Sequence, residues 1–226
     1  MNERQFRKLV VFVRRRGGGK PTGGQPWALH REDRILLVAV YWRTNLTMRR
    51  LGPLFGISNS AADRVIDHIA PRLALAPVRR QHPADTVLIV AASSKNYRYS
   101  SNRQVVIVAN TRMVVAAGRP LPGSRHDARA YRELGMDRVV KNVRVLGDGG
   151  YRGTPVLIPL WPRKDRPLTP GQQADNAVHR RASARVEHAF SRMNTYKVLR
   201  DCRVRGDEVH QAILGIARLR NLALAR

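Results

Sequence analysis

The stretch VRVLGDGGYRG, residues 143–153, decides the fold class. Its apolar start predicts a buried strand over Val143–Leu146, which leads into Asp148 followed by Gly149 and Gly150. In α/β folds, side chains at the C-terminal edge of a strand project into the crevice where ligands bind, and glycines let a backbone or a phosphate approach closely. An ordinary Asp-Gly turn is the alternative, but the strand that precedes it favours Asp148 as a site residue.

Upstream of this stretch, the hydrophobic pattern predicts three more strands. They cover Thr86–Val90, Gln104–Ala109 and Met113–Ala117, and Asn110-Thr111 joins the last two as a hairpin. A helix over Arg125–Leu134 then separates these strands from the one that leads to Asp148.

Downstream, the pattern is helical again. A long helix is predicted over Val178–Tyr196, and a final helix over Glu208–Leu224 is expected to pack back onto the sheet. Three strands, a helix, a fourth strand and then helices is the element order of an RNase H-like domain. The predicted fold class is therefore α/β, with an RNase H-like domain over residues 84–226 and an all-α region before it.

The residues before the sheet are predicted to be helical. Residues 1–16 are typical of a short basic helix and residues 17–26, GGGKPTGGQP, of a flexible linker, so a first segment ends at residue 26. The pattern from Asp33 to Leu75 is helical, and the first helix there has one apolar face, made of Ile35, Leu36, Ala39, Val40 and Trp42.

The segment TMRRLGPLFGISNSAADRVIDHI, residues 47–69, predicts two short helices around a glycine-containing turn. A second helix begins at Thr47, and a third begins at Ser58 or Ser60 and is disturbed or ended by Pro71. After a packing helix, this is the helix-turn-helix arrangement, predicted over residues 27–76. A helical bundle cap without a DNA role is the alternative. The DNA-reading version would place exposed side chains on phosphates or in the major groove, namely Arg49, Arg50, Ser58, Asn59, Ser60 and Arg64.

The charge of the chain points to a polyanionic partner. Its 226 residues include 42 Lys or Arg and 16 Asp or Glu, which gives a net charge of +26. Nucleic acid is the commonest partner of such a chain. The alternative is that a GC-rich coding sequence raises the arginine content without any role in binding. One cysteine excludes an internal disulfide, and the longest apolar run, Ile35–Trp42, is far shorter than the ~20 residues of a membrane helix. We expect a cytoplasmic protein that binds a polyanion and no membrane.

Because acids are scarce, each can be considered individually, and most lie at helix starts, on outward faces or in loops. Glu187 lies within RRASARVEHAFSRMNTYKVLRD, residues 180–201, beside a predicted buried stripe. By itself it would be expected to pair with a neighbouring arginine. Together with Asp148 it suggests two acids that converge on Mg²⁺ or Mn²⁺, as phosphoryl transfer requires.

Four segments resemble bacterial insertion-sequence transposases of the DDE type, in the branch that shares its nuclease domain with Harbinger-type transposases. They are residues 93–133 (SSKNYRYSSNRQVVIVANTRMVVAAGRPLPGSRHDARAYRE), 147–153 (GDGGYRG), 179–201, and the helical residues 22–75. By this resemblance, Asp148 is the second catalytic Asp, Glu187 is the catalytic Glu, and Asp127 falls where the family has an Asp beside the active centre. The resemblance also implies Mg²⁺ or Mn²⁺ ions, DNA partners (the element's terminal repeats and a target), a homodimer in the DNA complex and a location at the bacterial nucleoid.

One departure from the family concerns the first catalytic Asp. In the family, the first strand ends in Asp-Gly and opens a loop of about ten residues, whereas here TVLIV runs directly into Ala91-Ala92-Ser93-Ser94. Asp85 begins this strand, and at ~3.3 Å per residue it lies ~16 Å from the required end. Asp127 is the other acid that could replace the missing ligand. We therefore expect impaired cleavage, with a non-cutting DNA-binding remnant as the alternative and a generic RNA-binding protein as a weaker one.

Further DNA contacts are expected on both sides of Asp148. The segment Lys95–Tyr99 alternates bases and aromatic rings, a pattern suited to a distorted or single strand, although a solvated loop at a strand edge would look the same. The predicted DNA contacts outside the helix-turn-helix are Lys95, Tyr97, Arg98, Arg181, Arg185 and Lys197.

Overall fold

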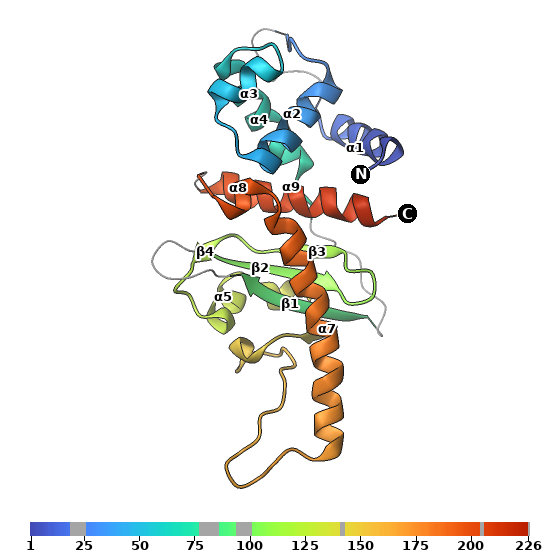
Figure 1. The fold of residues 1–226 in the computed structure, drawn as a ribbon, viewed down its shortest axis with the longest axis vertical. Helices are drawn as coiled ribbons and strands as arrows, with labels where there is room; N and C mark the ends of the chain where they lie inside the picture. Colours follow the sequence, from blue (N-terminus) through green and yellow to red (C-terminus); the bar gives the residue numbers. More distant parts are fainter. Residues whose placement is uncertain (19–25, 77–85, 94–100, 141–142, 204–205, 226) are drawn as a thin grey trace. The chain divides into compact units, whose positions relative to one another are not determined.

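The computed structural model describes residues 1–18, 26–76, 86–93, 101–140, 143–203 and 206–225. The chain forms two compact units (Figure 1). A helical unit combines Met1–Ala76 with Arg192–Arg226, and a sheet unit comprises Pro77–Ser191. Most of the predicted linker, residues 19–25, lies outside the described residues, as do Asp85, Lys95, Tyr97 and Arg98.

The helical unit begins with the predicted basic helix. Asn2 and Gln5 form a capping box at its start, and Leu9 and Val13 are its fully buried side chains. The helices of the unit are α1 (Glu3–Arg15), α2 (Arg31–Thr44), α3 (Met48–Leu54), α4 (Asn59–Leu73), α8 (Lys197–Arg200) and α9 (Asp207–Leu224). On α2, Ile35 and Trp42 are buried as predicted, but Leu36 is 45% exposed and Leu37 is buried instead.

The turn between α3 and α4 has the predicted geometry. Thr47 is the N-cap residue of α3, Gly56 has a φ of +66°, and Ser58 Oγ accepts a hydrogen bond from Ala61 N at 3.2 Å at the start of α4. Helix α4 continues two residues past Pro71 before it ends at Leu73. The local signals of capping and glycine therefore predict this part of the fold well.

The predicted packing of the last helix onto the sheet is wrong, because α9 packs in the helical unit against α4 and α8. A Cβ atom on Gly215 would lie 2.0 Å from Trp42 Cη2, so the glycine allows the indole of α2 to lie directly against α9. Arg218 donates from Nε and Nη2 to the carbonyls of Leu73 and Ala74, each at 3.0 Å. These carbonyls at the end of α4 thus gain partners from α9.

The sheet unit holds a mixed sheet in the order β3-β2-β1-β5, with β4 paired to β2 at the side. The strands are β1 (Val87–Ser93), β2 (Ser101–Val108), β3 (Val114–Ala117), β4 (Leu121–Pro122) and β5 (Arg144–Leu146). Strands β1, β2 and β3 pair antiparallel, whereas β5 runs parallel to β1. The predicted hairpin between β2 and β3 closes through Val108 N and Met113 O at 3.0 Å.

Helices lie on the two faces of this sheet. Short helices α5 (Asp127–Glu133) and α6 (Met136–Val139) contribute Tyr131 and Met136 to a core with Leu88, Val90 and Val145. Helix α7 (Pro170–Asn194) passes in front of the strands in Figure 1.

Helix α7 begins eight residues before the predicted start at Val178. Thr169 and Gln172 exchange backbone-to-side-chain hydrogen bonds there, with Thr169 N to Gln172 Oε1 at 3.0 Å and Gln172 N to Thr169 Oγ1 at 3.3 Å. This is a capping box, and Pro170 occupies the first helical position that it favours. The sequence TPGQ, residues 169–172, contains this capping signal.

Candidate active site and nucleic-acid interface

Asp148 lies just beyond the C-terminal end of β5, as predicted. It caps the short 3₁₀ helix Gly149–Tyr151, and its Oδ1 accepts a hydrogen bond from Gly150 N at 2.9 Å. Tyr151 is fully buried beneath this turn and meets Tyr131 edge to face, with ring centroids 5.9 Å apart. The buried ring anchors the turn, and the carboxylate stays exposed at the edge of the sheet.

Asp127 is held beside this edge by two buried amides of β2. Asn102 Nδ2 donates to Asp127 Oδ1 at 2.6 Å, and Gln104 Nε2 donates to the carbonyl oxygen of Asp127 at 2.8 Å. Asn102 and Gln104 are 0% exposed. The sequence-based prediction missed both, although polar residues two apart in an apolar strand share one face and could have indicated a buried polar contact.

The carboxylates of Asp127 and Asp148 converge over Gly150. A Cβ atom on Gly150 would lie 2.9 Å from Asp127 Oδ2 and 3.0 Å from Asp148 Oδ1. Burial raises the pKa of Asp127, the nearby Asp148 charge raises it further, and the hydrogen bond from Asn102 opposes both effects. Glycine is therefore needed so that the two acids can share this space, and a cation between them would relieve their repulsion.

Glu187, the third predicted site residue, lies on α7 and is exposed. Its neighbours Val186 and Ala189 are buried, which agrees with a glutamate beside a buried stripe. Across the described parts of the chain, no group of three or more His, Cys, Asp or Glu side chains could hold a metal ion. Helix α7 therefore does not bring Glu187 into one ligand group with the aspartate pair.

The strand next to β5, β1, carries no acid at its C-terminal end. The parallel register of the two strands ends with the pair Ile89 and Leu146, and two residues further along each segment are Ala91 and Asp148. β1 continues through Ala92 and Ser93, paired with β2 up to Arg103. A register continued beyond Leu146 would thus set the methyl group of Ala91 opposite Asp148.

Polar contacts fix α7 to the segment that follows Asp148. Asn176 pairs with the backbone of Leu160 through two hydrogen bonds, Leu160 N to Oδ1 at 2.9 Å and Nδ2 to Leu160 O at 2.8 Å. His179 Nε2 lies 3.1 Å from the carbonyl oxygen of Leu157. The buried His179 thus has a structural role, as expected for a histidine without other metal ligands nearby.

Arg185, a predicted DNA contact, belongs to the same set of contacts. Its Nη1 donates to Ala109 O at 2.7 Å, just past the end of β2. One donor of Arg185 therefore binds the protein backbone, and this hydrogen bond holds the turn of α7 that carries Glu187.

Family profiles match nearly the whole chain. The profile of the helix-turn-helix of DDE superfamily endonucleases matches residues 27–77, and that of the DDE superfamily endonuclease itself matches residues 81–221. This chain belongs to the DDE superfamily endonucleases.

Two insertion-sequence proteins are similar to this DDE superfamily member. The transposase assigned to insertion sequence element IS112 of Streptomyces albus G is 53% identical over 237 residues, covering 99% of this chain and 92% of the relative. The transposase assigned to element IS702 of Microchaete diplosiphon is 24% identical over 229 residues, covering 88% and 82%. The resemblance to insertion-sequence transposases of the DDE type is thereby confirmed.

The helix-turn-helix of this DDE superfamily member exposes the predicted DNA contacts. Arg49 and Arg50 on α3 and Ser58, Asn59 and Ser60 at the start of α4 are all exposed. Arg64 is exposed one turn further along α4.

Trp27, which the sequence-based prediction did not single out, supports this surface. Arg64 Cζ lies 5.5 Å from the Trp27 ring centroid and Arg34 Cζ lies 5.0 Å from it. The His68 ring is tilted against Trp27 at 5.0 Å. Trp27 therefore ties the segment before α2 to α4, and it orients Arg64 through a cation–π contact.

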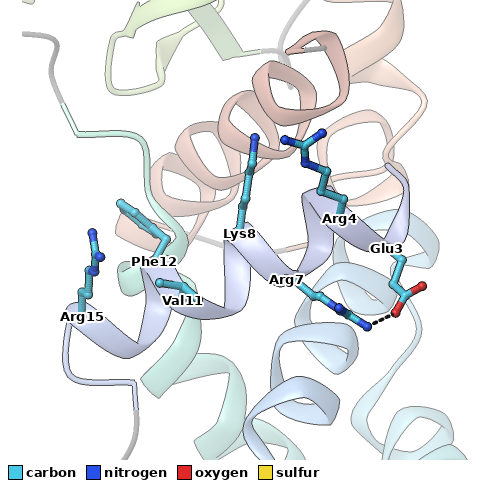
Figure 2. A pocket seen from close by; sticks show the side chains of 7 residues that line it. All are labelled: Glu3, Arg4, Arg7, Lys8, Val11, Phe12 and Arg15. Atoms are coloured by element: carbon cyan, nitrogen blue, oxygen red, sulfur yellow. Dashed lines mark hydrogen bonds and ion pairs between the residues drawn. The ribbon is translucent and has the colours of Figure 1, made fainter.

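Helix α1 adds a second basic surface to the helical unit. Its outward side chains line a shallow hollow of about 660 Å³, shown in Figure 2: Glu3, Arg4, Arg7, Lys8, Val11, Phe12 and Arg15. Glu3 pairs with Arg7, and both side chains are 77% exposed. The other cations of the lining are Arg4, Lys8 and Arg15, and the lining contains no acid besides Glu3.

The other predicted contacts are distributed over both units. Arg181 on α7 and Lys197 on α8 are exposed. No helix of the described residues is both long and apolar enough to cross a membrane.

Proposed function

We propose that this chain is an insertion-element transposase whose metal-dependent cleavage and strand transfer are impaired. It binds DNA at the ends of its element through the helix-turn-helix, and it acts at the nucleoid. The family membership and the names of the two relatives support this reading. The alternative within the same proposal is a DNA-binding remnant that no longer cuts.

The sheet supports an RNase H-like nuclease domain that begins near residue 84. Three antiparallel strands are followed by a strand parallel to the first, in the order β3-β2-β1-β5, and this is compatible with the predicted element order. A parallel bridge between Leu146 and Leu157 extends the sheet beyond β5. The proposed nuclease domain takes its acids from the ends of β5 and α5 and from α7.

A divalent cation, Mg²⁺ or Mn²⁺, would be held by the Asp127–Asp148 pair and approached by Glu187. The convergence of two carboxylates over Gly150 fits a hard cation that prefers oxygen ligands. When bound, the metal would stabilise the attacking and leaving oxygens of a phosphodiester. Asn102 and Gln104 orient Asp127 toward that position, and the exposed face of Asp148 leaves room for a phosphate.

The proposal that cleavage is impaired rests on one observation, the absence of a carboxylate at the end of β1. Two divalent ions bring four positive charges, and the pair of aspartates offsets only part of them in a chain of net charge +26. The alignment with the Streptomyces relative runs over 237 residues, more than the 226 of this chain, so gaps fall within this chain. A gap after β1 would remove a segment carrying the first Asp.

Contacts with DNA would come from both units. Arg49, Arg50 and Arg64 would contact phosphates beside the groove entered by Ser58–Ser60. Arg181 and Arg185 would follow the strand near Glu187, and Lys197 would add a contact from the helical unit. Lys95, Tyr97 and Arg98 would add contacts from outside the described residues. A homodimer would bring two element ends together in the DNA complex.

The test is cleavage of a supercoiled plasmid that carries the element's two terminal repeats, incubated with Mg²⁺ or Mn²⁺. We expect specific, salt-dependent binding of the ends and nicking that is lower by orders of magnitude than that of a complete three-acid homologue. Absence of all nicking, with end binding retained, would favour the remnant. Robust nicking that disappears in Asp148→Asn would show the impairment proposal to be wrong.

A gain-of-function variant makes the test sharper. Ala91→Asp places a carboxylate next to Asp148 across the β1–β5 register, and we expect it to tighten Mn²⁺ binding and raise nicking. Ala91→Asn has nearly the same size without the charge and serves as the matched control. The gain should vanish when Asp148→Asn is added to Ala91→Asp.

A further inference from the structure

A second hollow of the helical unit has no role in the function proposed above. It has a volume of about 530 Å³ and lies among α2, the residues that join α7 to α8, and α9. Its lining consists of Met1, Ala39, Val40, Arg43, Thr44, Arg192, Thr195, Tyr196, Leu219, Arg220 and Ala223. None of the predicted DNA contacts or catalytic acids is among these residues.

The rim of this hollow is strongly cationic. Three arginines line it, Arg43, Arg192 and Arg220, and no acid does. Arg220 is only 8% exposed, so its charge is largely withdrawn from bulk water. Arg43 and Arg192 are the exposed cations of this lining, and an anion seated between them would gain charge-assisted hydrogen bonds.

The position of Arg43 is set by its neighbours. Its guanidinium donates to Thr195 Oγ1 and lies over the Tyr196 ring, with Cζ 5.3 Å from the centroid. Thr195 Oγ1 in turn donates to Arg192 O at 2.7 Å. Burial raises the pKa of Tyr196, so its phenol stays neutral and adds no negative charge to the wall. The guanidinium of Arg43 is therefore preorganised on the wall of the hollow.

Most of the remaining lining is apolar. Ala39 and Val40 of α2 face the same hollow as Leu219 and Ala223 of α9. A hollow of this volume is large enough for a small organic ligand. Apolar walls, one aromatic ring and a rim of arginines suit a ligand with a flat body and a terminal anion.

We propose that this hollow binds a nucleoside phosphate, with the phosphate on Arg43, Arg192 and Arg220 and the base against the apolar wall. The nucleoside phosphate comes either from the end of a DNA strand, in which case the inference rests on the proposed function, or from a free nucleotide, in which case it does not. Both sources present the same chemistry to the three arginines.

The experiment is a calorimetric titration of the full-length chain with two probes, dAMP and a trinucleotide with a 5′-phosphate. The variants are Arg192→Gln and Arg43→Gln. Arg4→Gln on α1 is the matched control, because it removes the same charge from an exposed surface that does not line the hollow. Loss of a charge-assisted hydrogen bond predicts affinity lower by about tenfold or more in the two hollow variants, and little change in the control.

The outcomes are distinct. Tight binding of the trinucleotide and weak binding of dAMP assign the hollow to a DNA strand end, and equal binding of both probes assigns it to a free nucleotide. No saturable binding of either probe, or equal losses in Arg192→Gln and Arg4→Gln, overturns the proposal. Arg192 is exposed, so its variant is expected to fold, and circular dichroism checks this. Binding of duplex element ends, measured in parallel, separates failure of this inference from failure of the proposed function.

Discussion

The helical unit and the sheet unit of this chain differ in the functional features that they carry. The helical unit buries Trp42, exposes the predicted contacts of its helix-turn-helix and carries two hollows, each lined by at least three cations. The sheet unit retains its strand register through Ser93, yet it brings only two acids together, over Gly150. Hydrogen bonds and apolar burial hold the sheet together with no acid on β1. The difference teaches that the order of a sheet does not depend on a complete set of acids at its edge.

The largest expected effect comes from breaking the core of the helical unit. Trp42→Ala removes an indole that is 2% exposed and leaves a cavity against Gly215, at a cost of about 3–5 kcal/mol in the free energy of unfolding. We expect the binding of element ends to be lost, while chemical denaturation still shows a separate transition of the sheet unit. Leu36→Ala on the same helix, where the side chain is 45% exposed, is the control and should change stability little. Equal losses in both variants would contradict the assignment of Trp42 to the core.

The next effect tests how strongly the turn of the helix-turn-helix depends on its two glycines. A Cβ atom on Gly52 would lie 2.7 Å from the carbonyl oxygen of Ile57, which is backbone and cannot turn away. Gly52→Ala should therefore cost about 1–3 kcal/mol, measured by thermal unfolding, and weaken end binding. Gly56→Ala meets nothing within 4 Å but has a φ of +66°, so its cost of about 1–2 kcal/mol would come from backbone strain alone.

A smaller effect separates phosphate contact from base reading. Arg49→Gln combined with Arg50→Gln should weaken binding of specific and unrelated DNA alike, by about tenfold, and reduce the slope of log affinity against log salt by about 1 for each residue. Fluorescence polarisation at several salt concentrations measures both quantities. An unchanged slope would place these two arginines away from the phosphates. Arg7→Gln on α1 serves as the control for a general change in charge.

The smallest effect concerns the acids of the sheet unit. Burial and the charge of Asp148 raise the pKa of Asp127 in the folded state, so the folded state keeps this proton to a higher pH than the unfolded chain. The raised pKa therefore costs stability above that range. Asp127→Asn retains an acceptor for Asn102 and should raise the Tm modestly at pH 7. The gain should fade as the pH drops below the ordinary Asp pKa of about 3.9. A gain of equal size at pH 3 and pH 7 would show that charge is not its cause.

The local signals of the sequence predicted most elements but not their long-range packing. Thr47, Gly56 and Ser58 placed the helix-turn-helix, because capping and a left-handed turn depend on a few adjacent residues. The position of α9 was predicted wrongly, since its apolar face fits either a sheet or a helix bundle. The choice is made by the fit of Gly215 to Trp42, far apart in the sequence.

The candidate site shows the same limit. Asp148 could be located from the strand before it, and its neighbour Asp127 from the family resemblance. The hydrogen bonds from Asn102 and Gln104 to Asp127 could not be predicted, because they join residues more than twenty positions apart and depend on side-chain geometry. The roles of Asp148 and Glu187 in catalysis stay predictions. For Asp148, the prediction is supported by the carboxylate of Asp127, which converges with that of Asp148 over Gly150.

The helical unit is assembled from both ends of the chain, and this has a consequence for biosynthesis. As the chain leaves the ribosome, α2 and α4 emerge first, but the surfaces that α9 covers must wait until Asp207–Leu224 has been made. Domains generally fold as units during synthesis, so a product truncated before Asp207 would leave the indole of Trp42 without its cover. A prematurely terminated copy would then be cleared or aggregate before it could occupy an element end, and only finished chains would compete for DNA.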